Sequence, residues 1–472
     1  MTAYISSGSK EKTGSPDFRF IGTNITLVVI LFTALFIRLS PTPQEVFRDG
    51  FGIFGDTHLY HRIAYNLYMG NGFSGTLNKG AYGMVQKDAC IEYEPAITRG
   101  PVYPFFLFAV YKILGNPEDM KSIKTWHRNL DKVRIVQAVL DASLCILLFL
   151  MVRIICPESI WPALISAILY CFCPYNIFYT KALLAESIAT YLLTWTIFFC
   201  VMALKNNKSV WWWVGPGIGF GLVVLCRPEY LLVFPLLAVF ILFLHRRNLS
   251  AGLKKAGVFL ISAAIIISPW TIRNYALFKK LIIVAESGIG LNLFIGTYEN
   301  EDSWKGWKGS LVNIPDKDER EEFKKLSSSA GPFFKVGSIR AKEFDDGIKA
   351  LAIDRILNNP IDCLVNYIRK APRLWYQNYI PMYGVKEASG LYFIFYFAFA
   401  ICAYFGTERR SQIYFMPTVL IFFYLNVIFF PLHIEPRYSV ALMPGIITLA
   451  GIGIWKGLSL MIKRIRGIED RI

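Results

Sequence analysis

Long apolar segments constrain this chain more than any other feature of its sequence. A helix that crosses a membrane needs about 20 mostly apolar residues. Ten segments meet or approach that length, and they lie near 22–39, 134–154, 160–177, 182–204, 211–226, 229–244, 256–272, 388–405, 412–430 and 438–461. The chain is 18% charged, below the ~25% of an average soluble domain. The sequence therefore predicts an all-α polytopic membrane protein with about 10–11 transmembrane helices.

One further apolar run, 102–114, is too short to span a bilayer comfortably. The longer segments must cross the membrane in alternating directions, and this alternation leaves no place for 102–114 as a full span. We expect it to lie flat in the outer interface, or as a re-entrant element buried in protein.

The positive charges of the chain indicate how the segments are oriented. Cytoplasmic loops of membrane proteins carry an excess of Lys and Arg, so the most basic short loop, residues 245–255, should be cytoplasmic. Alternation from that loop puts the clusters at 205–208, 408–410 and 463–466, and the N-terminus, on the same side. The excess of 50 Lys and Arg over 34 Asp and Glu is thus a topology signal, and no nucleic-acid partner is predicted.

The same alternation divides the chain into five parts. They are a cytoplasmic tail with an uncleaved first membrane helix (1–40), a first outer loop with juxtamembrane helices (41–133), a membrane helix bundle (134–272), an outer segment with soluble helices (273–387), and C-terminal membrane helices with a cytoplasmic tail (388–472). No small-x-small cleavage site follows the first apolar run, which is why we read it as a helix that stays.

The outer segment late in the chain is expected to be helical but small. Apolar residues recur at helical spacing over 341–357, and Asn358-Asn359-Pro360 should stop that helix. A second helix, 362–374, looks amphipathic and near the membrane. The stretch 299–338, rich in Lys, Glu, Gly and Ser, is expected to be a mobile loop.

Most of the nine cysteines lie in apolar runs and are expected to act as small core residues. Cys90 and Cys363 fall in the two outer segments, where a disulfide between them is an open alternative.

Two carboxylates stand out at the outer ends of the predicted helices. Asp56 precedes an amphipathic helix, where the structural alternative is a simple N-cap. Glu186 starts an apolar helix, and a carboxylate there is costly unless it is paired or lines a wet cavity. Lys181, five residues earlier, is the expected partner of Glu186.

Several arginines lie at the same outer ends. Arg99, Arg227, Arg273 and Arg437 each interrupt or flank apolar sequence. A lone arginine of this kind can simply anchor lipid headgroups. Several on one face indicate a shared anionic ligand, because the guanidinium fork matches phosphate.

Two other patterns have simpler explanations. The glycines of Gly215–Gly221 lack the preceding strand and the Lys-Ser/Thr of a phosphate loop, and Gly217-x-x-x-Gly221 suits close helix packing. His58, His61 and His433 leave a metal site as an alternative, but no full ligand set is identifiable. No metal site is predicted, and a divalent metal stays an open alternative.

The order of these motifs carries a family resemblance. Gly55-Asp56 is followed by Tyr60, Gly70-Asn-Gly-Phe73 and Arg99-Gly-Pro-Val-Tyr-Pro104, and later by Glu186, Arg227-Pro, Arg273-Asn-Tyr and Arg437-Tyr438. This order resembles the C-type membrane glycosyltransferases, in the branch of the protein O-mannosyltransferases and the lipid A aminoarabinose transferases. The resemblance runs from about Asp56 to Met443.

The resemblance implies a sugar donor on a polyprenyl phosphate and an active site that opens outward at the membrane boundary. An acidic residue at the position of Asp56 would act near the acceptor or as the base, and basic residues late in the chain would hold the donor phosphate. The acidic pair of some relatives is a single Asp here, and their C-terminal soluble domain is absent from this sequence. Both departures leave the acceptor open as glycan, lipid or protein.

Glycosyl transfer needs a base for the acceptor hydroxyl and positive charge where the phosphate leaves. We therefore assign Asp56 as base or acceptor-positioning group, with Glu186 as the second candidate. The expected substrate-binding residues are Arg273, Arg437, Tyr438, Arg227 and Lys181 at the phosphate, Arg99 and Tyr60 at the sugar, and His433 beside them. A single displacement with one base would invert the anomeric centre.

The resulting prediction is a hexosyl- or pentosyltransferase of the inner membrane that acts on its outer, periplasmic face, among membrane lipids and without a firmly implied cofactor. One alternative is a flippase or transporter of lipid-linked saccharides, which would usually carry midplane charges and an inverted repeat. Another is a surface-polysaccharide ligase or polymerase, which would need a long outer loop rich in Arg and His.

Overall fold

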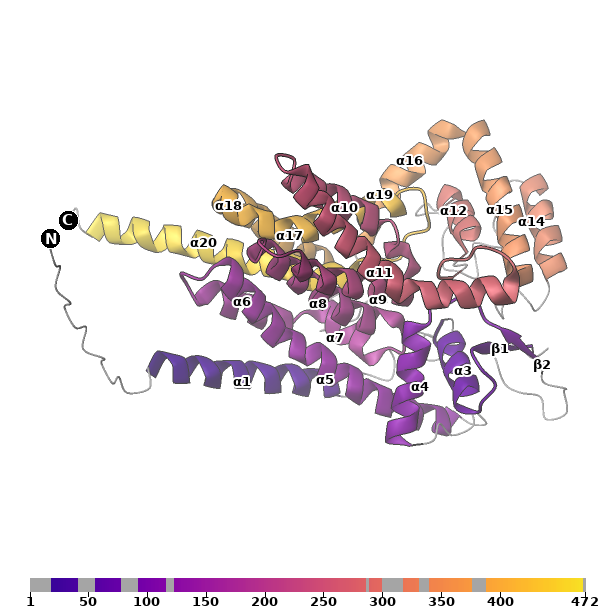
Figure 1. Ribbon diagram of the computed structural model, residues 1–472, viewed down its shortest axis with the longest axis horizontal. Coiled ribbons are helices and arrows are strands. Elements are labelled where there is room, and N and C mark those ends of the chain that lie inside the picture. The colour runs from indigo at the N-terminus through magenta and orange to yellow at the C-terminus, as the bar shows by residue number, and fades with distance from the viewer. Residues whose placement is uncertain are drawn as a thin grey trace, which may run out of the picture.

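The computed structural model describes residues 18–40, 56–77, 92–115, 123–285, 288–298, 317–330, 339–375 and 388–469. Helices make up almost all of this part of the chain (Figure 1). The long ones run side by side along the longest axis, with the start of α1 and the end of α20 toward one end and the smaller elements at the other. The predicted all-α membrane architecture is confirmed.

Each of the ten expected segments forms a helix or a short series of helices. They are α1 (Phe18–Leu39), α5 (Ile123–Ile155), α6 (Trp161–Cys171) with α7 (Pro174–Lys181), α8 (Ala185–Lys205), η3 (Val210–Trp213) with α9 (Val214–Cys226), η4 (Pro228–Tyr230) with α10 (Val233–Leu244), α11 (Leu249–Phe278), α17 (Ala388–Gly406), α18 (Arg409–Gln412) with η7 (Ile413–Phe415) and α19 (Met416–Phe429), and η8 (Pro436–Leu442) with α20 (Met443–Glu469).

Helix length separates these segments into two groups. Within the described ranges, five helices are long and apolar enough to cross a membrane, and α6 with α7, bent by 46°, makes a sixth if the pair is one span. In the other four expected segments, the stretches that enter this test are apolar helices of 10–17 residues: Thr23–Leu39 of α1, Val210–Cys226, Pro228–Leu244, and Tyr392–Gly406 of α17. Length alone thus supports five or six of the ten expected spans.

The short apolar run forms α4 (Val102–Leu114), which lies across the direction of the long helices (Figure 1). Tyr103, Leu107 and Tyr111 are buried against the bundle, whereas Ile113 is 79% exposed. A crosswise course agrees with the expectation that this segment does not span the membrane.

A small helical module follows α11. It consists of α12 (Ile289–Tyr298), α14 (Lys317–Ala330), α15 (Ile339–Asn358) and α16 (Pro360–Lys370), and ends in the 3₁₀ helix η6 (Ala371–Leu374). Phe294, Phe323, Phe344 and Ile348 form its own apolar core. Both helices expected in this region are confirmed, but the expected loop at 299–338 is wrong over α14, because Phe323 supplies an apolar anchor for that polar helix.

The first outer loop contains α3 (Asp56–Tyr68) and an antiparallel pair of strands, β1 (Ser74–Leu77) and β2 (Glu92–Pro95). These strands were not predicted from the sequence. Gly70 ends α3 with a φ of +84°, a conformation that favours glycine. The turn lets Phe73 return to pack against Ile63 of α3 and Ala96 beyond β2.

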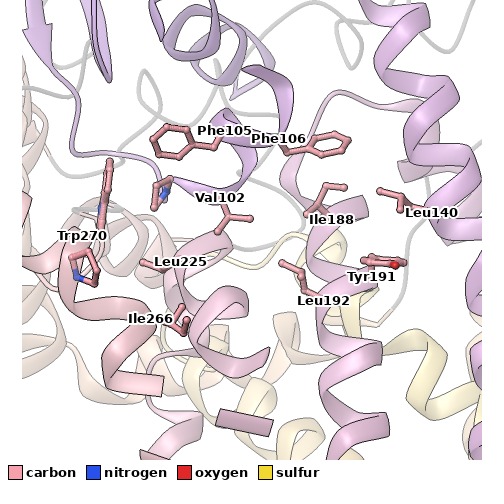
Figure 2. Close-up of a pocket in the computed structure, with 12 residues that line it drawn as sticks. Val102, Phe105, Phe106, Leu140, Ile188, Tyr191, Leu192, Leu225, Ile266 and Trp270 are labelled. Carbon is pink, nitrogen blue, oxygen red and sulfur yellow. The ribbon is translucent and has the colours of Figure 1, made fainter. Parts of the chain in front are cut away.

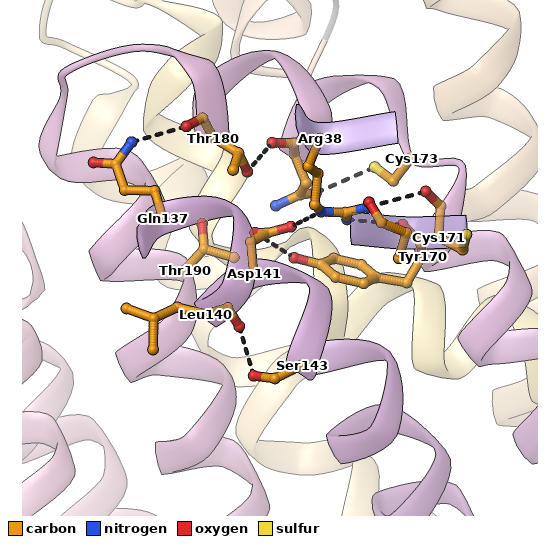
Figure 3. A network of polar contacts seen from close by, with 12 residues as sticks. Arg38, Gln137, Leu140, Asp141, Ser143, Tyr170, Cys171, Cys173, Thr180 and Thr190 are labelled. Atoms are coloured by element: carbon orange, nitrogen blue, oxygen red, sulfur yellow. Dashed lines mark hydrogen bonds and ion pairs between the residues drawn. The ribbon is translucent and has the colours of Figure 1, made fainter. Parts of the chain in front are cut away.

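A buried ion pair ties α1 to the bundle. Arg38 Nε donates to Asp141 of α5 at 2.5 Å, and the Tyr170 hydroxyl of α6 donates to the same carboxylate at 2.8 Å. The remaining Arg38 nitrogens donate to backbone carbonyls, including those of Tyr170 and Cys171 (Figure 3). A buried charge is tolerated only when it is paired and hydrogen-bonded, and this network meets both conditions.

Candidate active site

Asp56 is the first residue of α3, and two arginines occupy its carboxylate. Its Oδ1 accepts a hydrogen bond from Arg99, and its Oδ2 accepts one from Arg437 Nη1 at 3.1 Å. The partners lie 43 and 381 positions away in the sequence. This carboxylate therefore joins distant parts of the chain in addition to starting a helix.

A close backbone contact places Arg99. A Cβ atom on Gly100 would lie 2.2 Å from the carbonyl oxygen of Leu225, so only glycine fits between these two chains. Leu225 is near the end of α9, and Arg227 follows that helix. The contact thereby brings the loop of Arg99 against the segment that carries Arg227.

Glu186, at the start of α8, is 3% exposed and faces two arginines. Arg227 Nη1 lies 2.8 Å from its Oε1, and Arg437 Nε lies 3.7 Å from the same oxygen. The expected pairing with Lys181 is wrong: the Lys181 ammonium donates to Ser40 Oγ at 3.1 Å instead. Extended backbone at Ala182 and Leu184, between α7 and α8, separates residues that are only five positions apart.

Two further carboxylates complete the arrangement. Arg227 Nε donates to Glu229, and Glu435 Oε2 lies 2.5 Å from Arg437 Nε. His433 Nε2 lies 3.3 Å from the other oxygen of Glu435. Each carboxylate sits two residues from its arginine, across a proline.

Aromatic rings line the same arginines. The Tyr438 ring lies 5.5 Å from the Arg227 guanidinium and 5.6 Å from that of Arg437. The Tyr60 ring lies 5.7 Å from the guanidinium of Arg99. Such cation–π contacts hold the guanidinium planes without using their hydrogen-bond donors.

We call these seven charged residues the arginine–carboxylate cluster: Asp56, Arg99, Glu186, Arg227, Glu229, Glu435 and Arg437. Three guanidinium charges and four carboxylates give 3 − 4 = −1 when all are ionised. Each of the three arginines already has a carboxylate partner. An anionic ligand must therefore displace a carboxylate oxygen or add to the remaining donors.

The two carboxylates that lie clearly outside the spanning helices have lowered pKa values. Burial alone would raise the pKa of Asp56, but Arg99 and Arg437 outweigh burial and hold that pKa well below its usual range. Burial opposes Arg437 and His433 in the same way at Glu435, and the net result is a lowered pKa. Both groups are therefore carboxylates at neutral pH.

An apolar groove adjoins the cluster. It has a volume of about 630 Å³ and is lined by Pro101, Val102, Phe105, Phe106, Leu140, Ile188, Tyr191, Leu192, Leu225, Ile266, Pro269 and Trp270 (Figure 2). Pro101, Ile188 and Leu225 each lie two residues from a cluster member, namely Arg99, Glu186 and Arg227. The size falls in the range of ligand pockets, and three of the lining segments lead directly into charged groups.

Two expected phosphate ligands lie outside the cluster. Arg273 donates to the carbonyls of Ala96 and Phe73, at 3.0 and 3.1 Å, and its guanidinium lies 4.6 Å from the centre of the Trp270 ring. It supports the loop around the strands. Lys181 is held at Ser40, as described above. The structure brings together the other eight expected residues: Asp56, Tyr60, Arg99, Glu186, Arg227, His433, Arg437 and Tyr438.

The alternative of a histidine metal site gains no support in the described part of the chain. The Nδ1 of His61 lies 2.6 Å from the Tyr111 hydroxyl, and His433 faces Glu435. No group of three His, Cys, Asp or Glu side chains within the described ranges is arranged to hold a metal ion. Cys363 is buried in α16. Its possible partner Cys90 lies outside the described residues, so that pairing stays a prediction.

Glu229 and Glu435 were not among the site residues predicted from the sequence. Glu229 directly follows the motif Arg227-Pro, and Glu435 precedes Arg437 with one proline between them. A carboxylate two residues from an arginine across a proline is a usable signal, because the proline stiffens the short connection between the two charges.

Known proteins resemble this chain in part of its sequence and in its fold. Residues 98–272, just over a third of the chain, match the model of a family described as dolichyl-phosphate-mannose-protein mannosyltransferase. The matched range contains Arg99, Glu186 and Arg227. A search of curated proteins finds no match.

Among solved structures, the archaeal oligosaccharyltransferase AglB from Archaeoglobus fulgidus, in complex with an inhibitory peptide and a dolichol-phosphate, matches with a TM-score of 0.55 and 15% identity. The match covers 97% of this chain and 52% of that one. The apo form of the Archaeoglobus fulgidus enzyme matches with a TM-score of 0.55 and 14% identity, over 96% of this chain and 53% of that one. ArnT from Cupriavidus metallidurans matches with a TM-score of 0.40 and 15% identity, over 93% of this chain and 78% of that one.

This chain spans about half the length of the archaeal structures. The shared fold and the family match confirm the resemblance drawn from the order of the sequence motifs. The chain shares its fold with the archaeal oligosaccharyltransferase, as the resemblance to the C-type membrane glycosyltransferases predicts.

Proposed function

From this fold, we propose that the chain transfers a sugar from a polyprenyl-phosphate-linked donor to an acceptor hydroxyl at the outer, periplasmic face of an inner membrane. The arginine–carboxylate cluster beside the apolar groove is the observation that carries the proposal. A lipid-linked sugar phosphate combines an apolar lipid with an anionic head. The protein presents the groove for the lipid and the cluster for the head.

The groove supplies the site for the lipid. Its lining residues come from α4, α5, α8, α9 and α11, so a polyprenyl chain would lie between helices with its phosphate at their ends. The phosphate would then meet Arg227 and Arg437, which are the arginines shared between two or more carboxylates. Paired guanidinium donors stabilise the charge that develops as the phosphate leaves.

Asp56 supplies the group for the acceptor. Its carboxylate is 29% exposed and is ionised at neutral pH because two arginines lower its pKa. An ionised carboxylate accepts a hydrogen bond from the attacking hydroxyl and takes its proton as the new glycosidic bond forms. The low pKa makes it a weak base, so orientation of the acceptor is a large part of its role. Glu186 is the second candidate for this step.

A single displacement of this kind inverts the anomeric centre, because the acceptor attacks opposite the leaving phosphate. The proposal includes inversion and leaves the sugar, hexosyl or pentosyl, to experiment. A retained configuration in the product would contradict the inverting step alone.

The test is transfer in proteoliposomes. The purified full chain receives a panel of radiolabelled polyprenyl-phosphate sugars and a membrane extract as the acceptor source. We expect transfer from one donor, lost in Asp56→Asn and Arg437→Ala and kept in Arg246→Ala, a matched arginine at the opposite end of the bundle. Thermal stabilisation by one donor without transfer would support donor binding. Neither stabilisation nor transfer with any donor would contradict the proposal.

A further inference from the structure

The helix α16 presents an apolar face that no described part of the protein covers. Ile361, Leu364, Val365 and Ile368 are 75%, 49%, 38% and 59% exposed. Their spacing of three and four residues puts them on one side of the helix. An apolar face of this kind on an isolated amphipathic helix requires a partner surface.

The two other sides of α16 are chemically different. Asp362 and Arg369 are exposed polar residues on one flank. Cys363, Tyr367 and Lys370 are buried on the other. The helix therefore has an apolar face, a water face and a face packed on the protein.

The packed face fixes α16 at the end of a membrane helix. The Tyr367 ring lies 5.6 Å from that of Phe430, the residue that follows α19. Just beyond α16, the Trp375 ring packs edge-on against Phe393 and Phe397 of α17 and is tilted against Phe422 of α19. Figure 1 shows α16 beside the end of α19, meeting α15 at a corner. The exposed apolar face of α16 thus lies next to the aromatic side chains of α17 and α19.

The same packed face holds the segment that carries the late cluster residues. The buried Lys370 ammonium donates to the carbonyls of Gly296 and Leu432, at 3.0 and 2.6 Å. Leu432 directly precedes His433, whose backbone N–H donates to the Asn292 carbonyl of α12 at 2.8 Å. A Cβ on Gly296 would lie 2.2 Å from the carbonyl oxygen of Pro431, so these chains are in close contact.

We propose that α16 lies in the bilayer interface at the end of α19, with Ile361, Leu364, Val365 and Ile368 in the acyl region, and that it thereby positions Lys370 against the His433–Arg437 segment. The occupant of the apolar face is the lipid surface. Continuity with α17 and α19 favours it over a protein partner, and Arg369 on the flank suits the level of the headgroups.

The experiment places a fluorophore at two matched positions of the full chain. Leu364→Cys lies on the apolar face and Asp362→Cys on the water face of the same helix. Both are made with Cys90 and Cys402 replaced by serine, since Cys402 is an exposed thiol, and both are labelled with NBD. Proteoliposomes are then quenched with a lipid that carries a doxyl group near the top of its acyl chain, or with aqueous iodide.

We expect the label at 364 to be quenched by doxyl lipid and to resist iodide, and the label at 362 to show the reverse. Equal iodide quenching at both positions would overturn the proposal, because the face would then lie in water. Protection of 364 from both quenchers would also overturn it, because a protein would then cover the face.

The link to Lys370 has its own test, which rests on the proposed function. Leu364→Ser with Ile368→Ser should raise the KM for the donor several-fold and leave kcat and the unfolding temperature of the detergent-solubilised protein unchanged. Asp362→Ser is the control and should change neither constant. An unchanged KM in the double variant would overturn the link. If the chain transfers no sugar at all, the quenching result still decides where α16 lies.

Discussion

Arg437 and Asp56 form an ion pair of 3.1 Å across 381 residues of sequence. The pair joins the first outer loop to the segment that enters α20. Arg99 engages the other oxygen of the same carboxylate. The geometry of the cluster therefore depends on Asp56 as much as on the arginines.

Asp56→Asn should lower the rate of sugar transfer by about 10²–10⁴-fold, the usual contribution of a positioned acid–base group. The amide keeps the size of the side chain but loses the charge and the ability to take a proton. The measurement is kcat in proteoliposomes. Asp131→Asn, at an aspartate whose side chain is 65% exposed, is the control and should retain the rate. An unchanged kcat in Asp56→Asn would mean that another carboxylate acts as the base, and Glu186 would be the first to examine.

Arg227→Lys should weaken donor binding, although the charge is kept. Arg227 uses different nitrogens for Glu186 and Glu229, and a lysine ammonium cannot reproduce that planar fork. Loss of one charge-assisted hydrogen bond corresponds to about 1.5–3 kcal/mol. The KM for the donor reports the change, and Arg246→Lys serves as its matched control. Equal donor KM values in the wild type and Arg227→Lys would mean that Arg227 does not hold the phosphate.

The pH dependence follows from the lowered pKa of Asp56. A carboxylate with a lowered folded pKa contributes stability above its unfolded pKa of about 3.9 and loses it as the pH falls through the folded value. Asp56 should therefore add no acidic limb to the profile of kcat between about pH 5 and 8. An acidic limb in that range that disappears in Asp56→Glu would contradict the assignment.

Removing one member of the buried Arg38–Asp141 pair should destabilise the fold by about 3–5 kcal/mol. Asp141→Asn leaves the Arg38 charge buried without its partner. The triple variant Arg38→Met, Asp141→Leu and Tyr170→Phe removes the whole network and should be closer to the wild type. Thermal unfolding in detergent compares the two variants. If the triple variant is the less stable one, the pair stabilises the fold beyond its own desolvation.

Filling the apolar groove should act on the lipid part of the donor. Leu192→Trp replaces an aliphatic side chain of the groove with a larger indole ring. It should raise the KM for long-chain donors several-fold, with a smaller effect on short-chain analogues. Val239→Trp, at a position on α10 that is 62% exposed, controls for an added tryptophan. Equal effects on the KM of long-chain and short-chain donors would mean that the polyprenyl chain does not lie in this groove.

The arrangement of helices could be predicted from the sequence because burial in a membrane leaves a local signal. Each apolar run, from α1 to α20, is readable from composition and length. The amphipathic α15 and α16 were predicted from spacing in the same way. The helix α14 was missed because its composition is polar. It joins the fold through Phe323 and Leu326, which pack on the core of the module, and through the ion pair of Glu319 with Arg355 of α15.

The cluster was predictable as a set of residues but not as a set of pairs. Eight of the ten expected side chains converge, since charges at the same ends of packed helices must meet. Glu186 pairs with Arg227 in place of Lys181 because extended residues separate α7 from α8, and sequence spacing does not reveal that break. The hydrogen bond from Arg273 to the Ala96 carbonyl depends on the two strands, which have no strong local pattern in the sequence.

The position of Arg437 also sets the order in which the cluster can be assembled. The ribosome adds this residue 381 positions after Asp56, when α1 to α19 have already been made. Until then, Asp56 has only Arg99, and Glu186 has only Arg227, as a cationic partner within the cluster. In the described part of the chain, the ion pairs between the two halves of the cluster use the guanidinium of Arg437, which is added last of the seven residues during synthesis. A nascent chain on its way into the membrane therefore carries no completed site.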